Sequence, residues 1–281
     1  MSPGRPRRPP TRVASALFGP RVIDVDDLDL ALEAARIGAD VIRPRHVRSV
    51  EYKGTVDPVT NADTEAQERI ISVLAHHRPA DAILAEEHPG VAGATGRWWL
   101  IDPLDGTVNF VHGIPHVAVS IALYEDGQPL VGVVIDVFHR EEFSSVTGSG
   151  AWLDGRLLEV SDNAFDSSLV GTGFPYDRRE RAQELGAVVG TVLAHVQGLR
   201  RMGTASLDLA WVAAGRLDGF WEIGLKPWDV AAGLILVREA GGVATNLDGA
   251  PSTPFDSHFV VSNGIAHEPL RSLLASVMAD R

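Results

Sequence analysis

The chain has 281 residues, a formal net charge of −12 and no cysteine. The absence of thiols excludes a cysteine nucleophile, a thiolate zinc site and a disulfide framework, and it is typical of a cytoplasmic protein. An acidic surface repels nucleic acid phosphates, and no apolar run approaches the roughly 18 residues of a membrane span, so we expect neither a nucleic acid nor a membrane as partner.

The N-terminus differs in composition from the rest of the chain. Its first twelve residues hold four prolines and four arginines. Such a segment buries too little apolar surface to fold, so we predict a disordered tail over residues 1–22. No apolar stretch follows the basic residues, which argues against a secretory signal but leaves a transit peptide open. No linker interrupts the remainder, so residues 23–281 are predicted to form a single domain.

The first half of the chain predicts two helices followed by a sheet. Apolar residues recur at helical spacing over residues 27–42 and 62–77. Thr60 and Asp63 have the spacing of a capping box at the start of the second helix. Turn residues separate the later strands and indicate an antiparallel meander. The predicted strands are residues 82–85, 98–101, 116–124, 130–138, 142–147 and 152–160.

The second half alternates between strands and helices. Strands are predicted over residues 169–173, 219–223, 243–245 and 259–261. Helices are predicted over residues 178–195, 204–214, 230–240 and 268–278. Helices, then a mixed sheet, then alternating elements indicate a layered α/β or α+β architecture.

The chemistry is expected to come from carboxylates. The sequence contains no Gly-x-Ser-x-Gly elbow and no Gly-x-x-x-x-Gly-Lys-Ser/Thr loop. His112 and His116 have the spacing of a helical zinc pair, but the Gly and Pro between them argue against a helix. Four acidic segments remain: residues 57–63 with Lys53 before them, Glu86-Glu87, residues 98–110 (WWLIDPLDGTVNF) and residues 226–229 (KPWD).

Each acidic segment has an ordinary explanation and a chemical one. Asp63 and Asp229 fit helix caps, with Asp229 at the N-cap position, and Glu86-Glu87 fits a solvent-exposed pair. Adjacent carboxylates after a buried strand also repel each other, which a metal ion would relieve. Asp102 and Asp105 can converge on one point in a tight turn. The glycine that follows lets the backbone approach a ligand, and a helix starting there would offer N–H groups to an anion.

Together the four segments resemble the inositol monophosphatase family. Residues 98–110 resemble its first signature, and residues 226–242 resemble its second. The Asp-x-Val-Thr-x-x-Asp and Glu-Glu elements match in the right order, and the resemblance spans about residues 28–279. Ala85 stands where many members have Gly, and Leu104 replaces the commoner Ile. The proline- and arginine-rich start has no counterpart in the family.

The resemblance implies a fold and a set of site residues. The fold would be a layered α-β-α-β-α sandwich, like that of inositol monophosphatase and fructose-1,6-bisphosphatase. Two to three Mg²⁺ ions per site are implied, and hard oxygen ligands without thiols favour Mg²⁺ over zinc. The metal ligands would be Glu86, Asp102, the backbone carbonyl of Leu104, Asp105 and Asp229. The catalytic residues acting on water would be Asp57, Glu86 and Thr107. The substrate contacts would be Asp105, Gly106, Thr107, Ala205 and Glu222.

The implied reaction is Mg²⁺-dependent hydrolysis of a small sugar-alcohol phosphate by metal-activated water, without a phosphoenzyme. Inositol 1-phosphate is the first expected substrate, because Asn109-Phe110 and Glu222 fit a polyol phosphatase better than a nucleotide phosphatase. Histidinol phosphate and fructose 1,6-bisphosphate stay open as alternatives, and 3′-phosphoadenosine 5′-phosphate is a further substrate within the superfamily. The family also implies lithium inhibition and a homodimer. A different class of function, a protein-binding regulator with secondary phosphatase activity, is kept as well.

Overall fold

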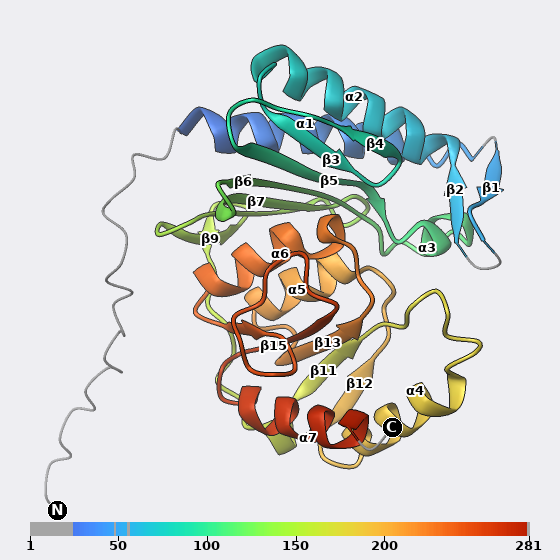
Figure 1. The fold of residues 1–281 in the computed structure, drawn as a ribbon, viewed down its shortest axis with the longest axis vertical. Helices are drawn as coiled ribbons and strands as arrows, with labels where there is room; N and C mark the ends of the chain where they lie inside the picture. Colours follow the sequence, from blue (N-terminus) through green and yellow to red (C-terminus); the bar gives the residue numbers. More distant parts are fainter. Residues whose placement is uncertain (1–24, 48, 55–56, 280–281) are drawn as a thin grey trace, which may run out of the picture.

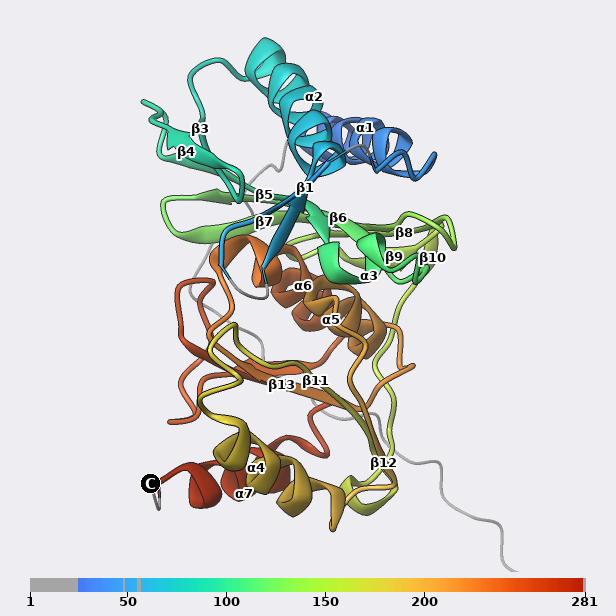
Figure 2. The same ribbon diagram turned by 90° about the vertical axis from the view of Figure 1, so that its right-hand side faces the viewer.

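The computed structural model of the chain describes residues 25–279 apart from residues 48 and 55–56. The tail predicted over residues 1–22 lies outside the described residues. Helices and sheets alternate in the order α-β-α-β-α along the molecule (Figure 1; Figure 2). This arrangement confirms the predicted fold class. No helix in the described part of the chain has the length and apolar character needed to cross a membrane.

The first layer is a pair of helices, α1 (Val25–Ile42) and α2 (Asn61–His77). They pack against each other and against one face of the larger sheet (Figure 1). Apolar side chains at helical spacing form the buried side of each helix, as Ala35 in α1 and Ile70 in α2 illustrate. The predicted helical periodicity therefore marked the side of each helix that meets the sheet.

The larger sheet has eight strands in the order β10-β9-β8-β7-β6-β5-β3-β4. The antiparallel meander predicted for its later strands is confirmed from β6 to β9. Only β3 and β5 run parallel to each other among its described strand pairs. The strands are β3 (Ala82–Ala85), β4 (His88–Val91), β5 (Arg97–Asp105), β6 (Ala118–Glu125), β7 (Gln128–Asp136), β8 (Glu141–Val146), β9 (Gly150–Leu153) and β10 (Arg156–Leu157).

The second sheet has five strands in the order β12-β11-β13-β15-β14. A helix pair lies between the two sheets and another covers the outer face (Figure 2). The inner pair is α5 (Ala205–Ala213) and α6 (Pro227–Glu239), and the outer pair is α4 (Ala182–Leu193) and α7 (His267–Ala279). The strands are β11 (Leu169–Thr172), β12 (Gly198–Arg200), β13 (Gly219–Ile223), β14 (Val243–Thr245) and β15 (His258–Ser262), and a 3₁₀ turn, η1 (Phe165–Ser167), precedes them.

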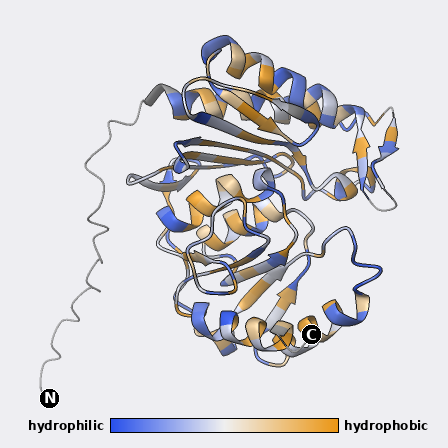
Figure 3. Ribbon diagram, viewed as in Figure 1, coloured by the Kyte–Doolittle hydropathy of each residue, from blue (hydrophilic) through white to orange (hydrophobic). Residues whose placement is uncertain are grey.

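Three apolar clusters hold the layers together. One lies between the larger sheet and α1 and α2, one joins both sheets through α5 and α6, and one lies between the second sheet and α4 and α7. Trp99 of β5 is fully buried beneath α1 and α2. Neighbouring residues of β13 point to opposite faces of the second sheet, because side chains alternate along a strand. Phe220 therefore packs in the cluster with α5 and α6, and Trp221 packs in the cluster with α4 and α7. Figure 3 shows the apolar residues on the facing sides of these layers.

The structure differs from the sequence predictions at several short elements. The strand predicted over residues 152–160 is divided into β9 and β10, because Asp154 (φ 49°) and Gly155 (φ 76°) reverse the chain between them. The helix predicted from residue 178 begins at residue 182, after a turn. The short strands β4 and β12 were not predicted, nor was the hairpin of β1 (Val50–Tyr52) and β2 (Pro58–Thr60).

Candidate active site

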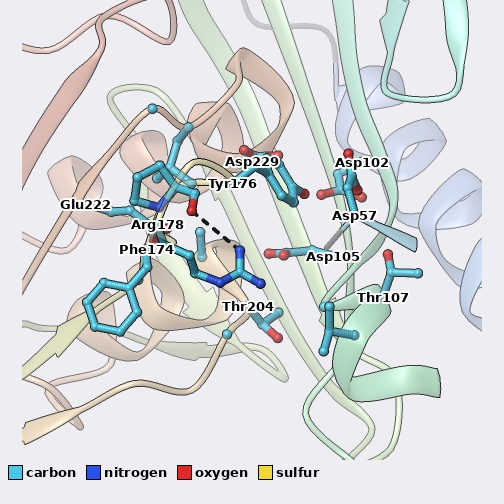
Figure 4. Close-up of a pocket in the computed structure, with 18 of the residues that line it drawn as sticks. Asp57, Asp102, Asp105, Thr107, Phe174, Tyr176, Arg178, Thr204, Glu222 and Asp229 are labelled. Atoms are coloured by element: carbon cyan, nitrogen blue, oxygen red, sulfur yellow. Dashed lines mark hydrogen bonds between the residues drawn. The ribbon is translucent and has the colours of Figure 1, made fainter. Parts of the chain in front are cut away.

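A pocket of about 310 Å³ opens beside the carboxyl ends of β3 and β5, between the two sheets (Figure 4). Its wall is built from segments far apart in the sequence: the end of the β1–β2 hairpin, the two strand ends, the loop after β11, and the starts of α5 and α6. All the predicted site residues line this pocket: Asp57, Glu86, Asp102, Leu104, Asp105, Gly106, Thr107, Ala205, Glu222 and Asp229.

Glu86 and Asp102 are brought together by strand pairing. Because β3 and β5 are parallel, their carboxyl ends meet at the same edge of the sheet. Ala85 pairs with Ile101, and the N–H of Glu86 donates to the Ile101 carbonyl at 3.2 Å. The residue that follows each strand partner, Glu86 on one side and Asp102 on the other, therefore reaches the pocket.

Asp105 reaches the same pocket because β5 is irregular at its end. The register between β5 and β6 shifts between Asp102 and Asp105, across Pro103, which has no N–H to donate. The Asp105 carboxylate accepts hydrogen bonds from the Ser206 N–H (2.7 Å) and hydroxyl (2.6 Å). These bonds tie the end of β5 to the first turn of α5, where Ala205 also lines the pocket.

A short helix, α3 (Thr107–Val111), begins directly after this turn. Gly106 is its N-cap and adopts φ 93°, a conformation that L side chains rarely adopt. The Thr107 hydroxyl lies 3.1 Å from both the Leu104 carbonyl and a carboxylate oxygen of Asp63, so it can donate to either. The hydroxyl oxygen keeps lone pairs that can accept from a group in the pocket.

Asp63 uses its two carboxylate oxygens for different purposes. One accepts from the N–H and hydroxyl of Thr60 at 2.8 and 2.5 Å, which confirms the predicted capping box of α2. The other accepts from Thr107. Burial raises the pKa of Asp63 to about 6. Its spacing from Thr60 predicted only a capping role, and nothing local in the sequence indicated the contact with Thr107.

Asp229 projects from the first turn of α6. The N-cap of this helix is Lys226, not Asp229 as its sequence position indicated, because Pro227 occupies the first helical position. The Asp229 carboxylate accepts from the Lys226 N–H at 2.7 Å, which fixes the side chain at the helix start. It lines the pocket from the face opposite β5 (Figure 4).

Glu222 lines the far side of the pocket from the end of β13. Gly173 makes room for it, since a Cβ at that residue would lie 2.0 Å from a Glu222 carboxylate oxygen. Burial, and next the charge of Asp208, raise the pKa of Glu222 to about 8. Its carboxyl group therefore retains a proton near neutral pH and can donate or accept a hydrogen bond.

The carboxylates at the strand ends and at α6 are buried close enough to disturb one another. Burial is the main cause that raises the pKa of Asp102 well above its usual value, and the charges of Glu86 and Asp105 add to it. Burial raises the pKa of Glu86 to about 7 against the opposing charge of Lys53, and that of Asp105 to about 6. Burial and Asp105 also raise the pKa of Asp229. Ionising all of them together requires a compensating positive charge.

The donor set fits a hard divalent cation. Carboxylate oxygens and the Leu104 carbonyl line the pocket, and no imidazole is among its lining residues. Lys53 supplies one positive charge, with its ammonium 3.4 Å from Glu86 and in closer contact with Glu87. Within residues 25–279, the described His, Asp and Glu side chains form no group of three already converged tightly on one point. The carboxylates surround the pocket instead, and they outnumber its positive side chains, which are Lys53, Arg178 and Arg201.

Comparison with known proteins identifies this arrangement. Residues 23–279 match the model of the inositol monophosphatase family. The chain is 41% identical over 230 residues to an inositol-1-monophosphatase of Mesorhizobium japonicum, an alignment that covers 81% of this chain and 85% of that protein. The chain belongs to the inositol monophosphatase family.

Other relatives and solved structures agree. A protein named Nus factor SuhB from Pseudomonas aeruginosa is 42% identical over 247 residues, covering 84% of this chain and 91% of that protein. The inositol monophosphatase of Anabaena superposes with a TM-score of 0.82 at 39% identity, covering 89% and 96% of the two chains. An IMPase of Thermotoga maritima gives 0.84 at 34% identity, covering 91% and 99%. As a family member the chain is a phosphatase, and phosphatases of this family are generally metal-dependent.

Within this inositol monophosphatase fold, the structure adds one contact that was not predicted. Sequence reasoning expected Asp57, Thr107 and Glu86 to act on water. Asp57 does line the pocket and is half-buried, but the carboxylate bonded to the Thr107 hydroxyl is Asp63. Ser206, which positions Asp105, was also not singled out as a site residue. Both contacts join residues far apart in the chain, so no local pattern could reveal them.

Proposed function

We propose that this phosphatase hydrolyses a small sugar-alcohol phosphate with Mg²⁺, and that inositol 1-phosphate, giving myo-inositol and phosphate, is its first substrate. The observation that supports this most is the gathering of Glu86, Asp102, Asp105 and Asp229 in one buried pocket, where they raise one another's pKa values. The relatives named inositol-1-monophosphatase favour the substrate.

Five groups would hold Mg²⁺: the carboxylates of Glu86, Asp102, Asp105 and Asp229, and the carbonyl of Leu104. We expect two to three ions, which is in keeping with the number of acidic oxygens at the pocket. When bound, the ions supply the positive charge that makes water nucleophilic and neutralises the phosphate. The carboxylates that repel one another in the free protein then become its ligands.

Thr107 and Asp63 would orient the attacking water. The Thr107 hydroxyl directs its hydrogen toward Asp63 or the Leu104 carbonyl, so its oxygen is left to accept a hydrogen bond from water. Asp63, with a pKa of about 6, can take up the proton that the hydroxyl passes on. We therefore propose that Asp63 joins Asp57, Glu86 and Thr107 in acting on this water. No covalent intermediate is required.

The phosphate and the alcohol would occupy opposite sides of the pocket. The N–H groups of Gly106 and Thr107 at the start of α3 would hold the phosphate, and Asp105 lies beside them. Ala205 and Glu222 line the side that would receive the alcohol. A protonated Glu222 can exchange hydrogen bonds with a hydroxyl group of a polyol.

Phosphate release from a substrate panel tests this proposal. We expect Mg²⁺-dependent release from inositol 1-phosphate to exceed that from histidinol phosphate, fructose 1,6-bisphosphate and 3′-phosphoadenosine 5′-phosphate, and lithium to inhibit it. Reactions with a chelator provide the metal-free control. Release led by another compound would change the substrate and keep the site, whereas no release from any compound would contradict the proposal.

Mg²⁺ is expected to bind more tightly at pH 8 than at pH 6. The ion binds ionised carboxylates, and protons compete for Glu86 and Asp105, whose pKa values are about 7 and about 6. In the metal-free protein the folded state holds protons that the unfolded state loses, so its stability falls as pH rises from about 4 to about 7. Calorimetric titration at both pH values measures the effect, and an equal dissociation constant at both would contradict it.

A second role is favoured by one relative's name. The protein of Pseudomonas aeruginosa is named a Nus factor, so we also propose a protein-binding role for this chain. Capture with the tagged chain, followed by identification of stoichiometric partners, tests it, and recovery of the chain without a partner would contradict it. A homodimer and a cytoplasmic location are further proposals from the family, which mass measurement in solution and cell fractionation would check.

A further inference from the structure

Two arginines line the active-site pocket without a carboxylate partner. Arg178 follows β11 and Arg201 precedes α5, and both contribute to the pocket wall. In the described part of the chain no carboxylate lies within 4 Å of either guanidinium group as an ion pair. Several other described arginines do have a carboxylate partner, for example Arg216 with Glu141 at 2.5 Å. Two unpaired cations in one pocket are available to an anion.

Arg178 is the more available of the two. Among the described residues, its side chain donates a single hydrogen bond, to the Pro175 carbonyl at 3.4 Å, so most of its five donors remain available. In Figure 4 its side chain enters from the side opposite Thr107 and points into the pocket. Arg201 has its guanidinium 5.7 Å from the Phe174 ring, and its charge also acts on the buried Asp208 and Glu222.

The pocket continues beyond Arg178. A second hollow, of about 190 Å³, shares Pro58, Val108 and Arg178 with the first. Its remaining wall includes Tyr52, which is 62% exposed, and His112. A group attached to the far end of a substrate therefore has space next to the Arg178 guanidinium while the phosphate stays at Gly106 and Thr107.

We propose that Arg178, assisted by Arg201, forms a subsite for a second acidic group on the alcohol part of the substrate. A planar guanidinium binds phosphate or carboxylate through two parallel hydrogen bonds, which a neutral polyol cannot match. The inference rests on the proposed phosphatase function and extends its substrate range, beyond inositol 1-phosphate, to monoesters that carry a second anionic group. Arg178 is then a specificity-determining residue that acts on the part of the substrate that does not react.

A matched substrate pair isolates this contact. Fructose 1-phosphate and fructose 1,6-bisphosphate differ only in the second phosphate, and their initial rates are compared at saturating free Mg²⁺. The Arg178→Gln variant is expected to lose about tenfold to a hundredfold in kcat/KM on the bisphosphate, as for a lost charged hydrogen bond, and less than about threefold on the monophosphate. Arg201→Gln should lose less, and Arg178→Lys should recover part of the loss.

Arg179→Gln is the matched control, because Arg179 is the exposed neighbour that does not line the pocket. It should leave both rates unchanged. Glycerol 2-phosphate and 2-phosphoglycerate form a second pair, in which the added anionic group is a carboxylate and not a phosphate. Tested in the same way, this pair shows which of the two anionic groups the subsite binds. If Arg178→Gln loses the preference for the anionic substrate in both pairs, the subsite binds anions in general. If it loses this preference in the fructose pair alone, the subsite is restricted to phosphate.

Two results would overturn the subsite. An equal loss on the monophosphate and the bisphosphate would place Arg178 at the phosphate that is cleaved, and no loss on either would leave it without a role in binding. Failure of the proposed function is seen separately, because wild-type protein would then release no phosphate from any compound with Mg²⁺. Retained turnover of fructose 1-phosphate by Arg178→Gln shows that the variant is folded.

Discussion

Replacing Asp102 by Asn is expected to lower kcat by at least about a thousandfold while the chain stays folded. Asp102 is 2% exposed and lies beside Glu86 at the edge where β3 and β5 end. Its oxygen accepts from the Leu104 N–H at 3.0 Å, a bond that the amide oxygen of Asn can keep. Only the negative charge is lost, and that charge is what would bind the metal. Turnover at saturating Mg²⁺ measures the effect.

Although its turnover falls, the metal-free Asp102→Asn variant should be at least as stable as the metal-free wild type. The charges of Glu86 and Asp105 raise the pKa of Asp102, so removing its carboxylate relieves repulsion in the metal-free protein. Its melting temperature without metal should equal or exceed that of the wild type, and the stabilisation by added Mg²⁺ should shrink. Asp136→Asn is the control, because Asp136 is equally buried but lies outside the pocket. Near-normal turnover by Asp102→Asn would contradict the assignment of the metal site.

The site residues were easiest to predict from the sequence where several of them lie in one short segment. Residues 102–110 place two carboxylates, a carbonyl and a glycine within one turn, so their convergence follows from local geometry alone. All the predicted site residues do line one pocket. What local patterns could not reveal was how Glu86 reaches Asp102, since the parallel pairing of β3 with β5 joins separate segments and depends on the whole sheet.

Residues with two roles were the hardest to predict. The capping box accounts fully for Asp63 in the sequence. In the structure its second carboxylate oxygen also contacts Thr107, because α2 and α3 both lie against β2. For Asp229, the capping position predicted from the sequence was itself wrong. It looked like an N-cap, but Pro227 starts the helix earlier and places Asp229 within the first turn, facing the pocket. Arg178 lies in a loop with no motif, and only the folded chain shows that it enters the pocket.

Gly106→Ala should disable the site through the backbone, without removing any functional side chain. The residue adopts φ 93°, and a Cβ there would lie 2.5 Å from the Thr204 hydroxyl and 3.0 Å from the His116 carbonyl. Those two groups are themselves joined by a 2.9 Å hydrogen bond, so neither can move freely. Relief requires the turn between Asp105 and Thr107 to shift, which displaces the groups proposed to hold phosphate. We expect a loss of about a hundredfold in kcat/KM, since small displacements in an active site have effects of this size.

Gly127→Ala separates this displacement from backbone strain alone. Gly127 adopts φ 77° in the turn between β6 and β7, and a Cβ there would meet nothing within 4 Å. Both variants place alanine in an unfavourable conformation, which costs about 1–3 kcal/mol, so both should melt a few degrees lower. Only Gly106→Ala should also lose activity, because only its Cβ collides with neighbours at the pocket. Equal activity of the two variants would mean that the turn at Gly106 can deform without disturbing Thr107, and that the N–H groups of this turn do not position the phosphate.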